Sequence, residues 1–225
     1  MKKIIYHGSA NIIEQPVYGG GKRYNDYGLG FYCTEVPEMA KEWAVDKDRD
    51  GYANGYEIDC TGLTILNLNS SDHCTLHWLA VLLQNREFDI LSGLAREAKR
   101  YLLEHFLPDY PKYDVIIGYR ADDSYFSFAQ DFINGTISYR QLSEAMKLGK
   151  LGWQFVLKSE KAFERIQYIG SEPVSAKEWF AKKEWRDKTA RRQYFQMDRD
   201  NWRRGELYIT QILDEEMRPD DPRLR

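Results

Sequence analysis

The feature that most constrains this chain is a stretch of eight residues, 27–34, that contains two glycines and three aromatic residues. Glycine lets a backbone approach a ligand closely, and aromatic rings form flat walls for a planar ring. Pro37 follows the stretch and predicts the first turn of a helix. Residues 6–9 (Tyr-His-Gly-Ser) follow an apolar pair and predict a strand that opens into a polar turn. Together the two stretches predict a pocket for a flat heterocycle with a polar edge.

The composition allows one large domain, or one domain with an extension, in 225 residues. The hydrophobic fraction of 43% is enough for a packed core, and the net charge of −3 gives no general case for nucleic acid or a membrane. We expect neither a signal peptide nor a membrane span, because no apolar run approaches ~20 residues. Cys33, Cys60 and Cys74 form no paired framework, which predicts a reducing compartment and a cytoplasmic protein.

Apolar residues recur with both strand and helix periods, which is typical of an α+β fold. The predicted strands are residues 2–6, 32–34, 56–60, 64–68, 113–118, 153–157 and 166–170. The predicted helices are residues 37–44, 72–83, 92–106, 124–133 and 138–146, with Ser71 or Asp72 as the cap of the second. Residues 12–21 and 46–55 are predicted loops, and residues 219–225 a disordered tail.

Two stretches resemble motifs of the ADP-ribosyltransferases of the diphtheria-toxin and poly(ADP-ribose) polymerase type. Residues 7–9 (His-Gly-Ser) are similar to the opening motif of that family. Residues 28–34 are similar to its second motif, which has the form Gly-x-Gly-aromatic-Tyr. Trp43 stands eleven positions after Tyr32, where the family has a second aromatic residue.

The third motif of the family is a strand that begins with a catalytic glutamate. Residues 154–157 (Gln-Phe-Val-Leu) are similar to it, with Gln154 in place of the glutamate. The whole chain more closely resembles an uncharacterised bacterial family of the same superfamily, whose members are suspected toxins often encoded beside a small antitoxin. The resemblance covers roughly residues 1–172, so we divide the chain into an ADP-ribosyltransferase-like domain, 1–172, and an extension, 173–225.

The resemblance implies that NAD is the substrate, that no metal takes part, and that one ADP-ribose unit passes to a macromolecule. His7 would hydrogen-bond the adenine-side ribose, the Gly8 backbone would hold the nicotinamide carboxamide, and Tyr32 would stack on the nicotinamide. The implied catalytic set is His7, Tyr32 and Gln154. The residues assigned to NAD binding are His7, Gly8, Ser9, Arg23, Gly30, Phe31, Tyr32, Thr34 and Trp43. Arg23 follows a run of glycines and could hold phosphates, or could belong to a solvated loop.

Two residues depart from the family pattern. Ala40 stands where the polymerases have a serine that binds the carboxamide. Gln154 can accept a hydrogen bond but cannot act as a base or balance a cation, so we expect single transfer or an inactive binding module. Asp122 or Asp123 could supply the missing carboxylate, although both also suit the cap of the following helix.

His73 and His77, with Cys74 between them, are an alternative as zinc ligands. They stand four apart on one helix face, but no Cys-x-x-Cys or His-Glu-x-x-His accompanies them, so we expect no metal site.

The extension has a local excess of positive charge, with ten Lys or Arg against five Asp or Glu in residues 176–205. Aromatic residues are interleaved with these charges, and the pattern predicts a long helix. Such a helix could bind nucleic acid through phosphate contacts and base stacking, or pack on the domain or on a small antitoxin.

The sequence therefore predicts an α+β fold of the ADP-ribosyltransferase type, with two small, mostly antiparallel sheets, an NAD cleft between them, helical insertions and a C-terminal helical extension. The expected activity is NAD-dependent mono-ADP-ribosylation of a protein or nucleic acid by a bacterial toxin, with plain NAD hydrolysis as an alternative reaction of the same site. The alternatives are an inactive NAD or ADP-ribose binding module, and a nucleic-acid-binding protein that acts through the extension.

Overall fold

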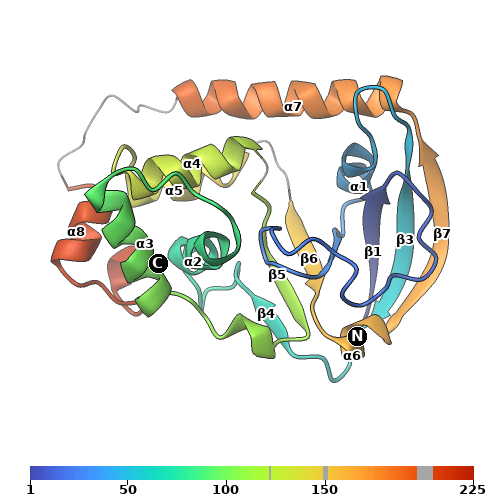
Figure 1. Cartoon of the computed structure of the whole chain (residues 1–225), viewed down its shortest axis with the longest axis horizontal. Helices are drawn as coiled ribbons and strands as arrows, with labels where there is room; N and C mark the ends of the chain where they lie inside the picture. The colour runs from blue at the N-terminus through green and yellow to red at the C-terminus, as the bar shows by residue number, and fades with distance from the viewer. Residues whose placement is uncertain (122, 149–151, 197–204) are drawn as a thin grey trace.

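The computed structural model describes residues 1–121, 123–148, 152–196 and 205–225, with only the backbone at 123–125. Its architecture is α+β, with two separate sheets and a group of helices beside one of them (Figure 1). The first sheet is fully antiparallel and has the order β1-β3-β7. Its strands are β1 (Lys2–Ser9), β3 (Gly51–Asp59) and β7 (Ile166–Val174).

The second sheet has four strands in the order β2-β6-β5-β4. Its strands are β2 (Phe31–Cys33), β6 (Trp153–Leu157), β5 (Val115–Tyr119) and β4 (Ile65–Asn67). The β4–β5 pair is parallel and the other two pairs are antiparallel. The two sheets meet where Tyr6 and Thr34 exchange backbone hydrogen bonds of 2.8 and 2.9 Å. The expectation of two mostly antiparallel sheets is therefore confirmed.

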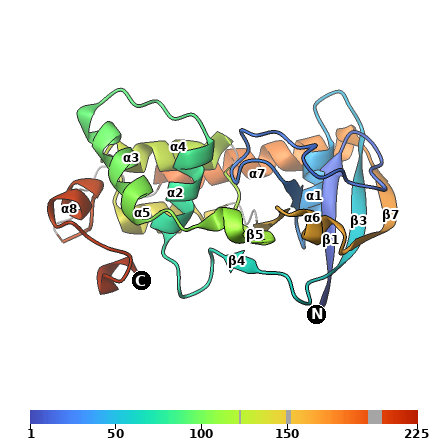
Figure 2. The same cartoon turned by 60° about the horizontal axis from the view of Figure 1, so that its bottom comes forward.

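The helices divide into three groups (Figures 1 and 2). α1 (Pro37–Ala44) packs on β1, and α6 (Glu160–Phe163) joins β6 to β7. A helical group forms the largest core cluster with the second sheet. Its members are α2 (Thr75–Asn85), α3 (Gly93–His105), α4 (Asp123–Ile133), α5 (Tyr139–Ala145) and α8 (Ile209–Asp214). The long helix α7 (Ala176–Gln196) runs across the molecule and contacts both α1 and α4. Short 3-10 helices cover Tyr110–Lys112 and Pro222–Leu224.

Local sequence signals account for several helix boundaries. The predicted helix start near residue 92 is confirmed: the side chain of Ser92 accepts a hydrogen bond from the Ala95 amide and caps α3. Ser138 and Gln141 form a capping box at the start of α5, where a helix from residue 138 was predicted. The predicted cap of α2 at Ser71 or Asp72 is wrong, because Cys74 is the cap residue and its amide donates to His77 Nδ1 at 3.1 Å.

Two predicted loops are wrong in part. The strand β1 continues through His7 and Gly8 to Ser9, where a polar turn was expected, because all eight of its residues pair with β3. Residues 51–55 are strand rather than loop. Gly51 is needed there for close packing, since a Cβ on it would lie 2.0 Å from the Ala44 carbonyl oxygen.

The predicted disordered tail is also wrong. Leu224 is 1% exposed and belongs to the helical core, and the hydroxyl of Tyr139 donates to its carbonyl oxygen at 2.7 Å. Arg223 Nη1 also donates to Glu215 Oε2 at 2.7 Å, so this mostly polar segment is docked by apolar and polar contacts together.

Candidate functional site

A cavity of about 490 Å³ opens where the two sheets meet, beneath α7. Its walls come from β1, β2, α1, β6, the ends of α2 and β5, and the middle of α7. Of the sequence-predicted site residues, the structure brings five together here: His7, Gly8, Tyr32, Trp43 and Gln154. A cavity of this size is in the range that binds small molecules and cofactors.

His7 is held in one tautomer by the backbone. Its Nδ1 lies 2.7 Å from the carbonyl oxygen of Tyr32, and because a carbonyl only accepts, Nδ1 carries the proton. Burial lowers the pKa of His7, and the hydrogen bond to Tyr32 opposes this shift only in part. A neutral ring protonated at Nδ1 leaves Nε2 as an acceptor. The Phe31 ring, 4.4 Å away between centroids, packs beside the imidazole.

Gly8 has a packing role as well as a place in the cavity wall. A Cβ on Gly8 would lie 1.9 Å from the Ala40 carbonyl oxygen and 2.7 Å from the Ala44 amide nitrogen. Only glycine therefore lets β1 approach α1 this closely. Ala40 is fully buried in this contact.

Tyr32 contributes the face of its ring, because its hydroxyl is already engaged. The hydroxyl donates to the Gly28 carbonyl oxygen at 2.5 Å and accepts from the Tyr27 amide at 3.0 Å. Burial raises the pKa of Tyr32 well above its ordinary value, so the phenol stays neutral. Gly28 has φ of +70°, which explains why glycine stands at this turn.

Trp43 forms another wall and carries an unsatisfied donor. Its indole Nε1 is buried and has no hydrogen-bond partner in the described part of the chain. The guanidinium of Arg120 lies over the indole ring, 4.9 Å from its centroid. A buried N–H without a partner is energetically costly.

Gln154 is the most buried polar residue among the predicted catalytic three, with 6% of its surface exposed. Its Nε2 faces Asp26 Oδ2 at 3.4 Å, and its Oε1 has no hydrogen-bond partner among the described residues. Asp26 also accepts from Arg86 Nη1 and from the Ala121 amide, both at 2.9 Å. The Asp26 carboxylate thus fixes the orientation of the Gln154 amide, whose buried oxygen is left as an acceptor without a partner among the described residues.

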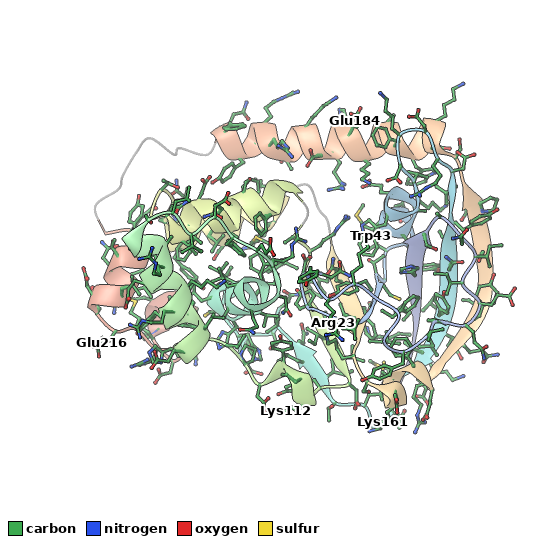
Figure 3. All side chains as sticks on the ribbon, in the orientation of Figure 1. Arg23, Trp43, Lys112, Lys161, Glu184 and Glu216 are labelled. Carbon is green, nitrogen blue, oxygen red and sulfur yellow. The ribbon has the colours of Figure 1, made fainter. Side chains whose placement is uncertain are left out.

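The roof of the cavity comes from α7, which contributes an aromatic residue, two cations and two acids. These residues are Phe180, Lys183, Glu184, Arg186 and Asp187. Arg186 Nε donates to Glu42 Oε2 of α1 at 2.7 Å, and both side chains are buried. α7 and α1 are therefore joined by an ion pair beside the cavity, and Figure 3 shows α7 passing above the segment that carries Trp43.

The other predicted NAD-binding residues do not line this cavity. Ser9 and Thr34 make local hydrogen bonds on β1 and before α1. Phe31 packs with Tyr56 and Phe163 between the sheets, and Gly30 lines a separate cavity of about 270 Å³. Arg23 is exposed on the loop before β2, where Figure 3 labels it.

Two further groups were considered as site residues: the acids Asp122 and Asp123, and the histidines His73 and His77. Asp122 lies outside the described residues, and so does the side chain of Asp123. His77 points back at the start of its own helix, with Nδ1 3.3 Å from Cys74 Sγ, and its ring meets His73 edge-on at 5.0 Å between centroids. Within the described residues, no group of three or more His, Cys, Asp or Glu could hold a metal ion.

Sequence reasoning missed Asp26, Arg86, Arg120 and Lys183 as site residues. Asp26 and Arg86 are 60 positions apart, and their pairing depends on the packing of α2 against the loop before β2. No motif marks either of them. The charge excess after residue 176 was visible, but nothing in it singled out Lys183.

None of the helices in the described part of the chain combines the length and the apolar character of a membrane span. A family model described as "Protein of unknown function (DUF3990)" matches residues 3–168, which is well over half of the chain. No curated protein matches the chain, and no solved structure matches it.

Proposed function

The chain belongs to the DUF3990 family of proteins of unknown function, and we propose that it is an NAD-dependent mono-ADP-ribosyltransferase of the kind found in bacterial toxins. One observation carries the proposal: His7, Tyr32, Trp43 and Gln154, which come from four separate elements, converge on one cavity. These are the residues that the resemblance to ADP-ribosyltransferases assigns to NAD. Under this proposal the two sheets that meet at the cavity form an ADP-ribosyltransferase-type core.

The reaction begins with cleavage of the bond between nicotinamide and ribose. The bonding electrons leave with nicotinamide and positive charge develops on the ribose. A nucleophile of the acceptor then forms the new bond to the ribose carbon and loses a proton to water. The protein's task is to hold the leaving group and stabilise this charge.

Each cavity residue has a role in that task. The Tyr32 ring would stack on nicotinamide, and His7 Nε2 would accept a hydrogen bond from a ribose hydroxyl. Gln154 Oε1, which lacks a partner among the described residues, would accept from the second ribose. Because an amide cannot act as a base, it would not activate a sugar hydroxyl for chain extension, and one ADP-ribose unit would be transferred.

The proposal is tested by nicotinamide release from NAD by the full-length protein, with lysate present as a source of acceptor. We expect release by the wild type and a loss of about a hundredfold in Gln154→Ala, the order seen when one transition-state hydrogen bond is removed. His7→Ala and Tyr32→Ala should also lose release, whereas Tyr24→Ala should not, because Tyr24 is 74% exposed.

Two outcomes would count against the enzyme. If NAD binds in calorimetry but no nicotinamide appears, the cavity belongs to a binding module. If the wild type neither binds nor cleaves NAD, the proposal fails as a whole.

A second candidate function is nucleic-acid binding by α7. Trp185 and Phe195 are 71% and 69% exposed on this helix, and Lys188 and Arg192 stand between them at helical spacing. Exposed aromatic residues alternating with cations suit base stacking and phosphate contacts.

Binding of a labelled single-stranded RNA at two salt concentrations tests this candidate. Affinity should fall as salt rises and should drop further in Trp185→Ala. Affinity that is the same in Trp185→Ala and the wild type would exclude the outer face of α7 as the binding surface.

A further inference from the structure

α7 is held in place at both ends by packing, so the turns between these ends form a fixed wall of the cavity. At its start, Trp179 and Phe180 pack on the small core that includes Ala40 and Val174. Near its end, the Tyr194 ring stacks on Phe128 at 3.8 Å between centroids. The Tyr194 hydroxyl also donates to Asp131 Oδ2 at 2.5 Å. The turns between these anchors form the roof over His7 and Trp43.

Lys183 is the unusual residue of this roof. It lines the cavity and is half-buried, yet its ammonium has no hydrogen-bond or ion-pair partner among the described residues. Its neighbours on α7 differ in this respect: Lys182 pairs with Glu178 at 2.6 Å, and Arg186 with Glu42. A partly desolvated ammonium without a direct partner is unfavourable unless a ligand supplies one.

The surroundings of Lys183 add positive charge. Burial is the main reason that its pKa is lowered, and Arg120 and Arg186 lower it further, while Asp46 and Glu42 act in the opposite sense. Arg120 is held against the Trp43 ring and also lines the cavity. The cavity therefore combines the point charge of Lys183 on α7 with the planar cation of Arg120, which follows β5, next to an aromatic wall; Glu184 and Asp187 of α7 line it as well. A point charge together with a planar cation is the combination that recognises phosphate groups.

We propose that Lys183 and Arg120 bind the diphosphate group of the ligand in this cavity, so that α7 completes the ligand site. Lys183 lies outside residues 3–168, which the family model matches, and so the site would need a residue from outside the family domain. The inference rests on the proposed function for the identity of the ligand as NAD. The attraction for a diphosphate itself follows from the charges of Lys183 and Arg120.

Calorimetric titration of the full-length protein tests this inference with two probes, inorganic pyrophosphate and ADP-ribose. Neither probe can be turned over by loss of nicotinamide. We expect Lys183→Ala and Lys183→Gln to bind both probes about 10- to 100-fold more weakly, the loss expected for one charge-assisted hydrogen bond. Lys183→Arg should keep most of the affinity, and nicotinamide alone should bind all variants equally.

Lys182→Ala is the matched control, because Lys182 lies on the same helix, is 51% exposed and pairs with Glu178, and neither residue lines the cavity. Its affinity for both probes should equal that of the wild type. The inference is overturned if the wild type binds neither probe, or if Lys183→Ala and Lys183→Gln bind them as tightly as Lys182→Ala.

These results separate the inference from the proposed function. Diphosphate binding that depends on Lys183, without any nicotinamide release, would support the anion site and contradict the proposed enzymatic activity. Nicotinamide release together with unchanged probe binding in Lys183→Ala would support the enzymatic activity and contradict the anion site.

Discussion

At the scale of single residues, Asp26 explains why a glutamine suits position 154. The Gln154 amide places its donor nitrogen 3.4 Å from the Asp26 carboxylate, in a region where Asp26 is 4% and Gln154 6% exposed. A glutamate would put a second carboxylate against the first in partly dry surroundings, where like charges repel strongly. The replacement of the glutamate of the ADP-ribosyltransferase motif by Gln154 is thus coupled to Asp26, a residue that this motif does not contain.

Gln154→Glu should therefore destabilise the protein and should not raise nicotinamide release. We expect a loss of about 1–3 kcal/mol in the free energy of unfolding at pH 7, measured by urea denaturation. The same substitution should cost less in an Asp26→Asn background, because the repelling charge is gone. An equal cost in both backgrounds would show that the two side chains do not interact.

His7 should make stability depend on pH. Its pKa is lowered in the folded protein, mainly by burial, so between that value and the ordinary 6.5 the unfolded chain binds more protons. The contribution is fully present above pH 6.5 and is lost as the pH falls from 6.5 through the folded value. His77, whose pKa burial also lowers, acts in the same direction.

Urea unfolding at pH 8 and at pH 5.5 measures this effect. His7→Asn, which keeps a donor for the Tyr32 carbonyl, should lose less stability between the two pH values than the wild type. The double variant with His77→Asn should lose still less. If His7→Asn has the same pH dependence as the wild type, the His7 ring is not buried as described.

Short motifs were sufficient to find His7, Tyr32, Trp43 and Gln154, because each stands at a fixed place on a strand or helix that can be identified locally. Asp26 and Arg120 could not be found in this way. Their positions depend on packing between segments far apart in the chain, such as the contact of Asp26 with the Ala121 amide. Their side chains carry no periodic or spacing signal.

At the scale of elements, α7 is attached to the first half of the molecule by a buried ion pair, Glu42 with Arg186. The two side chains are 5% and 8% exposed. Removal of one partner leaves the other charge buried, so Glu42→Ala should cost about 3–5 kcal/mol in unfolding free energy. Replacement of both, as Glu42→Leu with Arg186→Met, should recover most of that loss.

Glu178→Ala is the control for this prediction. Glu178 pairs with Lys182 on the exposed side of α7, and a surface pair contributes at most about 1 kcal/mol. Urea denaturation should therefore separate the two variants by at least about 2 kcal/mol. Similar losses in both would mean that the Glu42 pair is not buried in solution.

Helix and strand boundaries could be predicted where the sequence signal was local. The predictions were wrong where the boundary depended on packing with distant segments. Ser92 and Ser138 marked helix starts through their own side chains. Residues 51–55 looked like a loop because they are rich in small and polar residues. They form strand because they pair with β1 on one side and β7 on the other, and glycine stands at position 51 because a Cβ there would lie 2.0 Å from the Ala44 carbonyl oxygen.

At the scale of the whole molecule, the C-terminal segment returns to the helical half after α7 has crossed the cavity. The strand β7 already runs past residue 172 to Val174, so the compositional change there does not coincide with the end of a strand. Ile209, Ile212 and Met217 join the largest core cluster. Composition identified the basic helix, but it could not show which surfaces the helix and the following segment cover.

Leu224, the most C-terminal residue of the largest core cluster, gives the sharpest test of this arrangement. Leu224 is 1% exposed, is next to last in the segment whose polar composition predicted disorder, and its carbonyl oxygen accepts a hydrogen bond from the Tyr139 hydroxyl. Leu224→Ala should cost about 2–5 kcal/mol in unfolding free energy, as truncation of a packed leucine does, and should lower Tm for the whole protein in one transition.

The control is Leu91→Ala, at a leucine that is 90% exposed, which should stay within about 0.5 kcal/mol of the wild type. A Leu224→Ala protein as stable as Leu91→Ala would mean that the C-terminal residues only rest on the surface. A large loss would make them part of the same cooperative unit as the helices, which hold one wall of the cavity in place.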